Sequence, residues 1–277
     1  MSKFIPNALT IAGVDPSGGA GVLADIKAMS AVGAYATGVI TALTAQSTQG
    51  VMGIYPIDIA FIKQQIDVLF EDVRIDAVKI GMLGQEPVIH TVVDRLSHWQ
   101  PAHLVVDPVM VAKSGDHLLE KAATAAMREA MLPLATFITP NLPEAGVLLE
   151  QRPAENIKEM YSAAEKLRRL LSDDGDRWVF LKGGHLPGSD CTDLLYNGDQ
   201  MIEMPAHRIH TKNTHGTGCT LSAALAGLLP QTENPVQAAK IAKEYLYKAI
   251  ARADDLTVGS GHGPVNHFHG WWKPASA

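Results

Sequence analysis

The chain of 277 residues is longer than a typical single domain but within the range of one α/β domain. With 47% hydrophobic and 19% charged residues, a large core is available and intrinsic disorder is excluded. The formal net charge of -6 argues against general nucleic-acid binding, so we expect no nucleic-acid partner. Two cysteines exclude a disulfide framework and no apolar run is long enough to span a membrane, so we expect a cytoplasmic protein with no membrane contact.

The chain opens with a short apolar run, residues 8–12, which predicts a buried first strand. A loop rich in turn-forming residues, 13–21, leads into a helix that we expect to end at Gly33. This order of strand, glycine-rich loop and helix is similar to a nucleotide-binding opening. The loop lacks both the dinucleotide-binding and the P-loop spacing of glycines, so neither of those sites is predicted.

Strands and helices alternate through most of the remaining chain. We predict strands at 38–46, 77–80, 103–106, 137–138 and 178–181, and helices at 59–70, 87–99, 118–131, 143–149 and 156–171. This alternation indicates a mostly parallel sheet with helices on both faces. Asn197-Gly198, between runs 192–196 and 200–204, predicts an antiparallel hairpin at one edge. Without a repeat or linker, residues 1–277 are predicted to be a single domain.

The most distinctive stretch is 212–220, which precedes a small-residue helical run at 221–229. Gly216 and Gly218 allow a sharp turn and leave backbone N–H groups uncovered. Those N–H groups and the positive end of the following helix suit an anion, above all a phosphate. Cys219 is expected at the helix N-terminus, where a thiol pKa tends to fall. The spacing alone leaves open an ordinary glycine-containing loop.

Candidate site residues follow one predicted strand after another. They are Asp15, Gln46, Met82, Asp107, Asn141 with Glu144, Lys182 and the loop 216–219. Singly, Asp107 has an ordinary explanation as a turn residue, Asn141 as a helix cap and Lys182 as solvated surface. Because ligands bind beyond the carboxyl ends of strands in open α/β sheets, the set together predicts a phosphoryl-transfer site. Lys182 would reach a nucleotide phosphate, and the loop backbone would hold the developing charge on the transferred group. Oxygen groups of Asp107, Asn141 and Glu144 would organise Mg²⁺, directly or through water.

A family likeness is carried by several stretches in a fixed order along the chain: 12–21, 24–27, 41–48, 79–83, 107–115, 139–145, 181–185 and 211–220. They resemble the signatures of the hydroxymethylpyrimidine/phosphomethylpyrimidine kinases of the ribokinase superfamily, and the resemblance runs from about Asn7 to the tail at 263–269. It implies an α/β, ribokinase-like three-layer sandwich and a homodimer. It also implies ATP-dependent phosphorylation of 4-amino-5-hydroxymethyl-2-methylpyrimidine (HMP) to its monophosphate and then to the diphosphate, in thiamine diphosphate biosynthesis.

The resemblance places the ring-recognition glutamine of the family on Gln46, whose amide offers a donor and an acceptor to an aminopyrimidine. Other pocket positions of the family match Gly13, Asp25, Met82 and Val109. The superfamily's Asn-x-x-Glu motif, tied to Mg²⁺ and phosphate, falls on Asn141 and Glu144, with Asp107 and Glu144 as the expected Mg²⁺ residues. We expect Asp107, Asn141, Glu144, Lys182, Lys113 and Thr214 to lie beside ATP. Residues 113–115 are interpreted as part of a mobile flap, with an ordinary exposed loop as the alternative.

The catalytic loop departs from the wider superfamily. Most ribokinase-like enzymes carry Gly-Ala-Gly-Asp with the aspartate as base, whereas this chain reads Gly216, Thr217, Gly218, Cys219, as its subgroup does. A Cys219 thiolate would accept the proton of the substrate hydroxyl; alternatively the thiol is only a contact and anion stabilisation does most of the catalysis. We predict that Cys219→Ala loses most activity while ATP still binds.

Two other functions stay open. Pyridoxal kinase has a similar fold and ATP site, although Gln46 and Met82 favour the pyrimidine. A catalytically silent binding protein is the second alternative, and the intact set of phosphate-site residues argues against it. Metal binding by His262, His267 and His269 is set aside because their spacing matches no strong zinc pattern.

Overall fold

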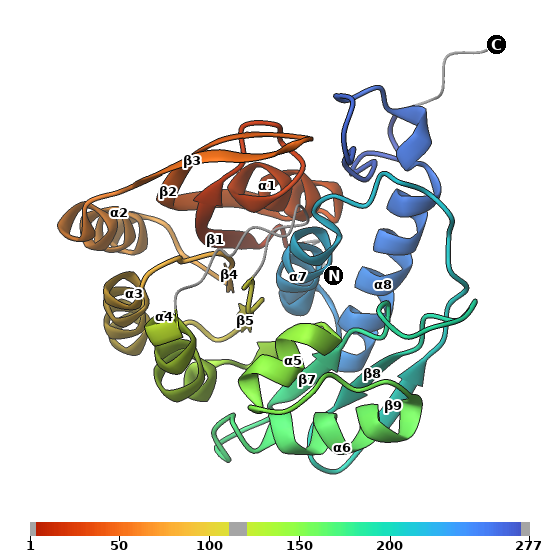
Figure 1. Cartoon of the computed structure of the whole chain (residues 1–277). Helices are drawn as coiled ribbons and strands as arrows, with labels where there is room; N and C mark the ends of the chain where they lie inside the picture. The colour runs from red at the N-terminus through yellow and green to blue at the C-terminus, as the bar shows by residue number, and fades with distance from the viewer. Residues whose placement is uncertain (1–3, 111–120, 273–277) are drawn as a thin grey trace.

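The computed structural model describes residues 4–110 and 121–272. Within them one nine-stranded sheet has the order β3-β2-β1-β4-β5-β6-β7-β8-β9. The strands are β1 (Asn7–Val14), β2 (Tyr35–Ser47), β3 (Gly50–Pro56), β4 (Ala77–Ile80), β5 (Leu104–Val106), β6 (Phe137–Ile138), β7 (Trp178–Leu181), β8 (Asp193–Tyr196) and β9 (Met201–Met204). Strands β2, β1, β4, β5, β6 and β7 are parallel, whereas β3 at one edge and β8 and β9 at the other pair antiparallel (Figure 1).

Helices cover both faces of this sheet. The α-helices of the described ranges are α1 (Gly21–Ala31), α2 (Ile59–Asp72), α3 (Glu86–Trp99), α4 (Lys121–Ala126), α5 (Leu142–Leu148), α6 (Ile157–Arg168), α7 (Thr217–Leu228) and α8 (Pro235–Ala251). Buried residues of α1, α7 and α8 form one hydrophobic cluster and those of α2 to α6 form the other. Along β4, Ala77 belongs to the first cluster and Val78 and Ile80 to the second, as expected for a strand buried on both faces. The predicted three-layer α/β sandwich is therefore confirmed.

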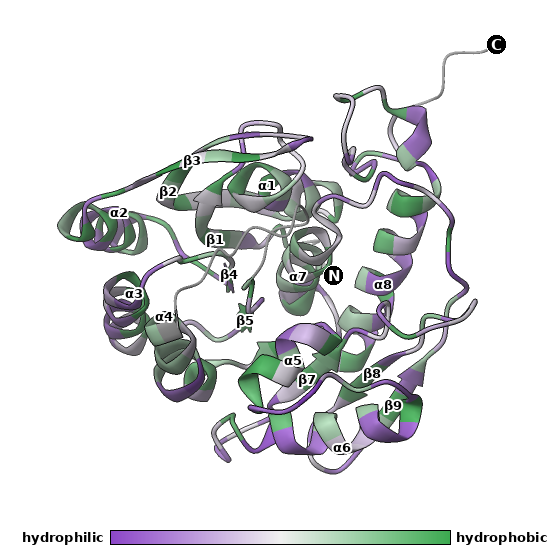
Figure 2. Cartoon of the chain, in the orientation of Figure 1, coloured by the Kyte–Doolittle hydropathy of each residue, from purple (hydrophilic) through white to green (hydrophobic). Residues whose placement is uncertain are grey.

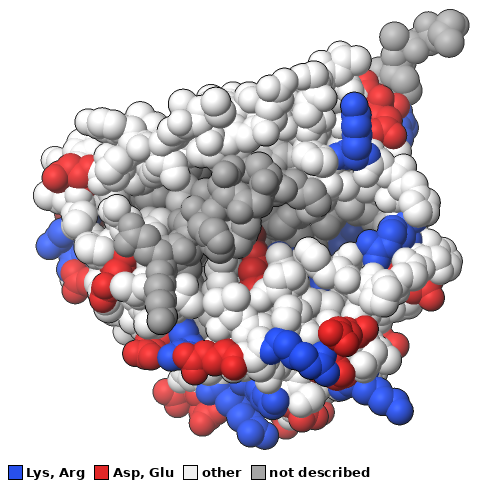
Figure 3. Space-filling model, in the orientation of Figure 1, with Lys and Arg blue, Asp and Glu red and all other residues white. Residues whose placement is uncertain are grey.

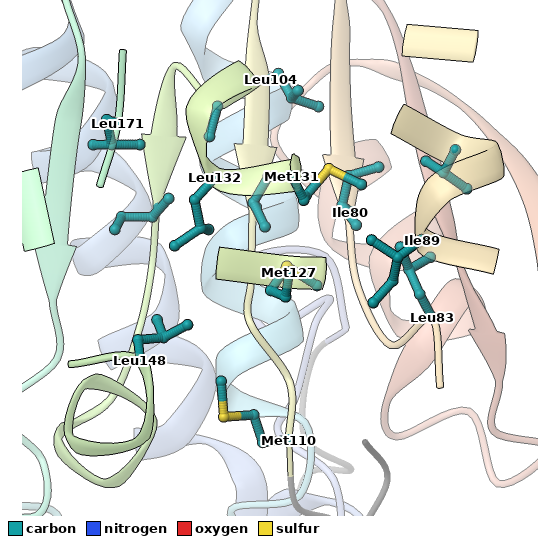
Figure 4. Close-up of a cluster of buried hydrophobic side chains, with 14 of the residues drawn as sticks. Ile80, Leu83, Ile89, Leu104, Met110, Met127, Met131, Leu132, Leu148 and Leu171 are labelled. Atoms are coloured by element: carbon teal, nitrogen blue, oxygen red, sulfur yellow. The ribbon is translucent and has the colours of Figure 1, made fainter. Parts of the chain in front are cut away.

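The cluster beneath α2 to α6 is the larger core. Figure 4 shows Ile80 and Leu104 of the sheet beside Met127, Met131 and Leu132 from the segment after α4. The helices that cover this core point their polar residues toward solvent. Along α6, hydrophilic and hydrophobic positions alternate (Figure 2). This packing fixes the strands whose carboxyl ends carry the candidate site residues.

Two parts of the sequence prediction need correction, and a third lies outside the described residues. Strand β2 is longer than 38–46, and its hairpin partner β3 was not predicted because Met52, Ile54 and Tyr55 face outward from a strand that contains two glycines and a proline. In the described part of the predicted helix 118–131, α4 gives way to a π-helix, Met127–Met131, and then a 3₁₀ turn containing Pro133. The predicted flap, 113–115, lies outside the described residues.

Each described helix is too short or too polar to cross a lipid bilayer. In the tail, His267 is buried and pairs with Thr220 of α7 at 3.0 Å. His269 stacks obliquely on Tyr245, with ring centroids 5.3 Å apart. These contacts give His267 and His269 structural roles in the packing of the tail.

Candidate active site

A cavity of about 780 Å³ lies at the carboxyl ends of the parallel strands, where α7 begins. It adjoins β1 and β4, between which the strand order reverses, the usual position of a ligand site in such sheets. Most of the predicted site residues line it: Gly13, Gln46, Met82, Asp107, Val109, Asn141, Glu144, Lys182, Thr214, Gly216, Thr217, Gly218 and Cys219. The structure thus brings together residues from strand ends spread over most of the sequence.

Two predicted site residues are not among the described residues that line the cavity. Asp25 lies on α1 with its carboxylate fully buried, and its Oδ2 accepts hydrogen bonds from Thr10 Oγ1 at 2.6 Å and Lys79 Nζ at 2.8 Å. Asp25 is thus part of a buried ion pair with Lys79, and its expected contact with the substrate stays a prediction. Lys113, the other residue, lies outside the described ranges.

The acidic and basic groups at the Lys182 end of the cavity form one buried cluster. Lys182 Nζ lies 3.2 Å from Asp107 Oδ1 and 3.8 Å from Glu144 Oε2. Asp107 also accepts hydrogen bonds from Thr139 and Ser222. Burial opposes protonation of Lys182, but Asp107 and Glu144 more than offset it and raise its pKa. Lys182 is therefore a permanent cation at neutral pH.

Glu144 shares that single cation with Asp107. Burial raises the pKa of Glu144 to about 7, Lys182 opposes the rise, and the negative charge of Asp107 adds to it. The two carboxylates are thus only partly neutralised by Lys182. A further cation in the cavity would be stabilised by their excess negative charge.

Asn141 and Glu144 form a reciprocal capping box at the start of α5. The Glu144 N–H donates to Asn141 Oδ1 at 2.9 Å, and the Asn141 N–H donates to Glu144 Oε2 at 2.7 Å. The cap explanation of Asn141 therefore holds. It leaves Asn141 Nδ2 and Glu144 Oε1 outside the cap, on two residues that line the cavity.

The loop before α7 has the geometry of an anion site. Gly216 has φ 73°, in the left-handed region, and a Cβ there would overlap the carbonyl oxygen of Gly19. Only glycine fits this turn, after which the first N–H groups of α7 have no partner one turn earlier in the helix. A Cβ at Gly218 would lie 3.3 Å from Lys182 Nζ and 3.4 Å from Asp107 Oδ2, so the loop faces the charged cluster directly.

The pKa of Cys219 corrects the sequence-based expectation. Burial raises the pKa of the thiol to about 11, although nearby Lys79 acts in the opposite direction. The expectation of a lowered pKa at the helix N-terminus considered only the local dipole. Enclosure by the surrounding protein outweighs it, so the thiol is protonated at neutral pH.

The opposite end of the cavity is less polar. Gly13 donates its N–H to the Met82 carbonyl at 3.1 Å, and a Cβ on Gly13 would lie 2.5 Å from Met82 Cε. Gln46 Oε1 accepts a hydrogen bond from Thr44 Oγ1 at 3.1 Å, which orients the amide. This end can take a flat, apolar ring with a polar edge.

Sequence reasoning missed the wall that α8 contributes. Leu246, Tyr247 and Ile250 line the cavity together with the segment 206–209. On α8 these side chains have ordinary helical spacing, which indicates core packing rather than a site. Lys243 also lines the cavity but is fully engaged, because it donates to Asp193, Cys191 and Met204.

Among the described residues, no group of three or more His, Cys, Asp or Glu side chains is placed to hold a metal ion. Mg²⁺ commonly takes only one or two protein carboxylates and completes its shell with water and substrate phosphates. Asp107 and Glu144, whose negative charges are only partly neutralised by Lys182, meet that requirement.

Comparison with known proteins agrees with this geometry. The phosphomethylpyrimidine kinase family model matches residues 15–266. The hydroxymethylpyrimidine/phosphomethylpyrimidine kinase of Escherichia coli is 51% identical over 96% of this chain and 98% of its own length. That of Rhizobium meliloti is 47% identical over the same shares.

Solved structures give the same fold. A phosphomethylpyrimidine kinase from Clostridium difficile superposes with a TM-score of 0.77 at 38% identity, covering 88% of this chain and 99% of that one. A Bacillus subtilis pyridoxal kinase in complex with ADP gives 0.86 at 32% identity, covering 95% and 98%. With the family model matched over most of its length and close relatives covered from end to end, this chain belongs to the phosphomethylpyrimidine kinase family.

Proposed function

We propose that this protein transfers the γ-phosphoryl group of ATP to the hydroxymethyl group of HMP, and then phosphorylates the resulting monophosphate, as a step of thiamine biosynthesis. The observation that carries the proposal is the cavity itself, whose lining combines the N-terminus of α7 and Lys182 with Gln46 and Met82. A relative that carries both activities in its name and is 51% identical to this chain supports it.

In this proposal the phosphates lie between Lys182 and the N-terminus of α7. The ammonium neutralises charge on the transferred group, and the N–H groups of Gly218 and Cys219 stabilise the charge that develops on its oxygens. The apolar wall of Leu246, Tyr247 and Ile250 accommodates the nucleotide base. The pyrimidine hydroxyl points toward Cys219.

Mg²⁺ fits the acidic side of this cavity. Asp107 and Glu144 would hold it, directly or through water, with the remaining ligands drawn from water and phosphate. When bound, the ion neutralises phosphate charge. Its positive charge would also lower the pKa of Glu144, which burial holds near 7.

Because its pKa is near 11, Cys219 enters the reaction as a neutral thiol. We therefore assign most of the catalysis to positioning and anion stabilisation. The thiol contacts the acceptor hydroxyl. The hydroxyl proton passes to the sulfur only if substrate binding lowers the thiol pKa, and otherwise it goes to an oxygen of the transferred phosphoryl group.

Pyridoxal is the second candidate substrate, because pyridoxal kinases of Bacillus subtilis and Staphylococcus aureus superpose with TM-scores of 0.86 and 0.85. Their identities to this chain are 32% and 30%, well below the 51% of the pyrimidine kinase from Escherichia coli. Gln46 suits an aminopyrimidine edge, which favours HMP.

We further propose that residues 1–277 act as one kinase domain, that the protein is cytoplasmic, and that it forms a homodimer through the β2–β3 edge. Both cysteines are free thiols, which suits a reducing compartment. Large apolar side chains on β2 and β3 are exposed, including Met52 at 87% and Tyr55 at 70%. Figure 3 shows this part of the surface almost without charged residues, a combination typical of protein–protein contacts.

A coupled assay of ADP release tests the proposal. With ATP and Mg²⁺, we expect turnover on HMP and on its monophosphate, and slow or no turnover on pyridoxal. Preference for pyridoxal would replace the proposed substrate. No turnover with any of the three would favour a silent binding protein.

A further inference from the structure

Two loops that lie far apart in the sequence meet in the cavity wall. One is the glycine-rich loop 13–21, which includes the end of β1 and the first residue of α1, and the other is the loop 212–219, which includes the first three residues of α7. They are joined by Asp15 and His215, since His215 Nε2 lies 2.6 Å from Asp15 Oδ2. Both side chains are buried, and both residues line the cavity.

Asp15 is anchored within its own loop. Its Oδ1 accepts the Ser17 N–H at 2.9 Å, and its Oδ2 accepts the Ser17 hydroxyl at 2.9 Å and the Ala20 N–H at 3.1 Å. Burial raises the pKa of Asp15, but hydrogen bonds from His215 and Ser17 more than offset it, so the pKa lies below its usual value. The carboxylate is therefore a charged, fully bonded anchor for the imidazole.

His215 is held from its other sides as well. Its backbone N–H donates to the Gly263 carbonyl at 3.0 Å. Its ring lies against Gly19, where a Cβ would overlap ring atom Cδ2. The next residue, Gly216, approaches the Gly19 carbonyl so closely that it also has no room for a Cβ. The imidazole is thus packed at the junction of the two loops.

A third contact links the loops at their far ends. The Gly21 backbone lies close enough to Cys219 to lower the pKa of its thiol. Loop 13–21 begins at Gly13, which touches Met82 in the ring pocket, and loop 212–219 ends at the N–H groups that face Lys182. The junction therefore fixes the distance between the ring pocket and the phosphate cradle.

We propose that Asp15 and His215 are a positioning pair that holds the phosphate-binding N–H groups of α7 in register with the pyrimidine pocket. The inference rests on the proposed kinase function. Neither side chain is assigned a step in the transfer. Misplacing a reacting group by about 1 Å can cost on the order of a hundredfold in rate, so the pair acts on kcat more than on the binding of either substrate.

The kinetic test compares His215→Leu, Asp15→Asn, the double variant and His215→Gln. We expect His215→Leu and Asp15→Asn each to lower kcat by roughly ten- to a hundredfold, with KM for ATP and HMP changed by less than about threefold. Because the two residues act as one unit, the double variant should lose no more than the worse single variant. Gln places an amide donor near the position of Nε2, so it should recover most of the lost kcat.

The control is His90→Asn, which removes the exposed His90–Glu86 pair on α3, 3.6 Å apart and outside the cavity. It should leave kcat unchanged. The pair has no positioning role if folded His215→Leu keeps kcat within twofold of wild type, or if His215→Gln is as impaired as His215→Leu.

Amide hydrogen exchange provides a readout that does not depend on turnover. His215→Leu should accelerate exchange in residues 15–20 as well as in 214–219, whereas His90→Asn should change neither segment. If exchange in 15–20 is unchanged, the linkage between the loops is refuted. If the wild type phosphorylates no substrate, the proposed function fails, and the exchange experiment still decides whether the pair couples the loops. Should His215→Leu fail to fold, Asp15→Asn, which keeps the side-chain size, gives the same two outcomes.

Discussion

Lys182 Nζ lies 3.2 Å from Oδ1 of Asp107, a carboxylate whose side chain is almost completely buried. The pair faces Gly218 in the first turn of α7. A buried ion pair of this kind contributes little net stability, but removing one partner leaves an uncompensated charge. In the proposed function, charge balance and catalysis therefore depend on the same lysine.

Lys182→Met is expected to lower kcat by at least about a hundredfold, because it removes the cation that faces the transferred phosphoryl group. It should also destabilise the protein by roughly 3 kcal/mol, since Asp107 is left buried without its partner. Urea unfolding and the coupled assay measure the two effects. The double variant Lys182→Met/Asp107→Asn should regain stability without regaining turnover. A single variant with kcat within threefold of wild type would contradict the role of Lys182.

Glu144→Gln is expected to change how stability depends on pH. The pKa of Glu144 rises from its ordinary 4.5 to about 7 on folding, so the folded protein binds an extra proton between these values. Stability from this group therefore falls as pH rises from about 4.5 to 7, and the variant should flatten that part of the curve. The amide oxygen still accepts the Asn141 N–H, so the capping box survives.

Urea unfolding between pH 5 and 7.5 checks this expectation. Glu159→Gln on α6 is the matched control: its hydrogen bond with Arg152 lowers the pKa of Glu159 to about 2, so its titration lies below the window. Identical slopes for wild type and Glu144→Gln would refute the raised pKa.

Cys219 should be alkylated slowly at neutral pH. A pKa of about 11 leaves a far smaller thiolate fraction than in an unperturbed cysteine, whose pKa is about 8.5, so reaction with iodoacetamide at pH 7.5 should be at least tenfold slower than for free cysteine. Mass spectrometry of the Cys219 peptide measures the rate. Rapid alkylation at pH 7.5 would show that the Cys219 thiol ionises near neutral pH and would support its role as a thiolate base.

Cys219→Ala should still bind ATP but lose most turnover, because the thiol lies beside the acceptor hydroxyl in the proposed complex. Isothermal titration with ATP and the coupled assay separate these effects. Near-normal turnover would show that the backbone N–H groups suffice without the side chain.

Gly216→Ala is expected to be severely impaired, because the new methyl group would overlap the Gly19 carbonyl in addition to straining a residue at φ 73°. Gly175→Ala is the matched control, since φ is 78° there but a Cβ would meet no atom within 4 Å. The control should lose only about 1–2 kcal/mol of stability through backbone strain. Equal losses in the two variants, by thermal unfolding, would show that the contact between the loops contributes nothing.

Met52→Glu combined with Tyr55→Glu should convert the proposed homodimer to monomer, because both side chains are among the most exposed apolar groups and lie on β3. Sedimentation velocity measures the change. Ile241→Glu, on α8 and 38% exposed, is the control and should leave the dimer intact. A wild type that sediments as a monomer would refute the dimer.

Sequence patterns predicted the layers and most of the site because each parallel strand ends in the same direction. Asp107 and Lys182 follow buried strands β5 and β7, so knowledge of strand direction alone brings them together. The capping box at Asn141 and Glu144 is likewise a local pattern. These features can be predicted without knowing how side chains far apart in the sequence pack together.

The features that escaped prediction depend on tertiary contacts. Asp25 is turned toward Lys79, a residue 54 positions away, and becomes a buried ion pair. The pKa of Cys219 is set by burial rather than by the helix N-terminus that the sequence reveals. Strand β3 follows neither an alternating nor a continuous apolar pattern, because its larger apolar side chains face outward.

The separation of 200 residues between Asp15 and His215 also has a consequence for biosynthesis. At roughly 5–20 residues per second, a ribosome needs about 10–40 s to add the chain between them. Throughout that interval the Asp15 carboxylate has no His215 imidazole to pair with. The cavity wall can close only after almost the whole chain has been made, so nascent chains that stop short of α7 should bind neither substrate.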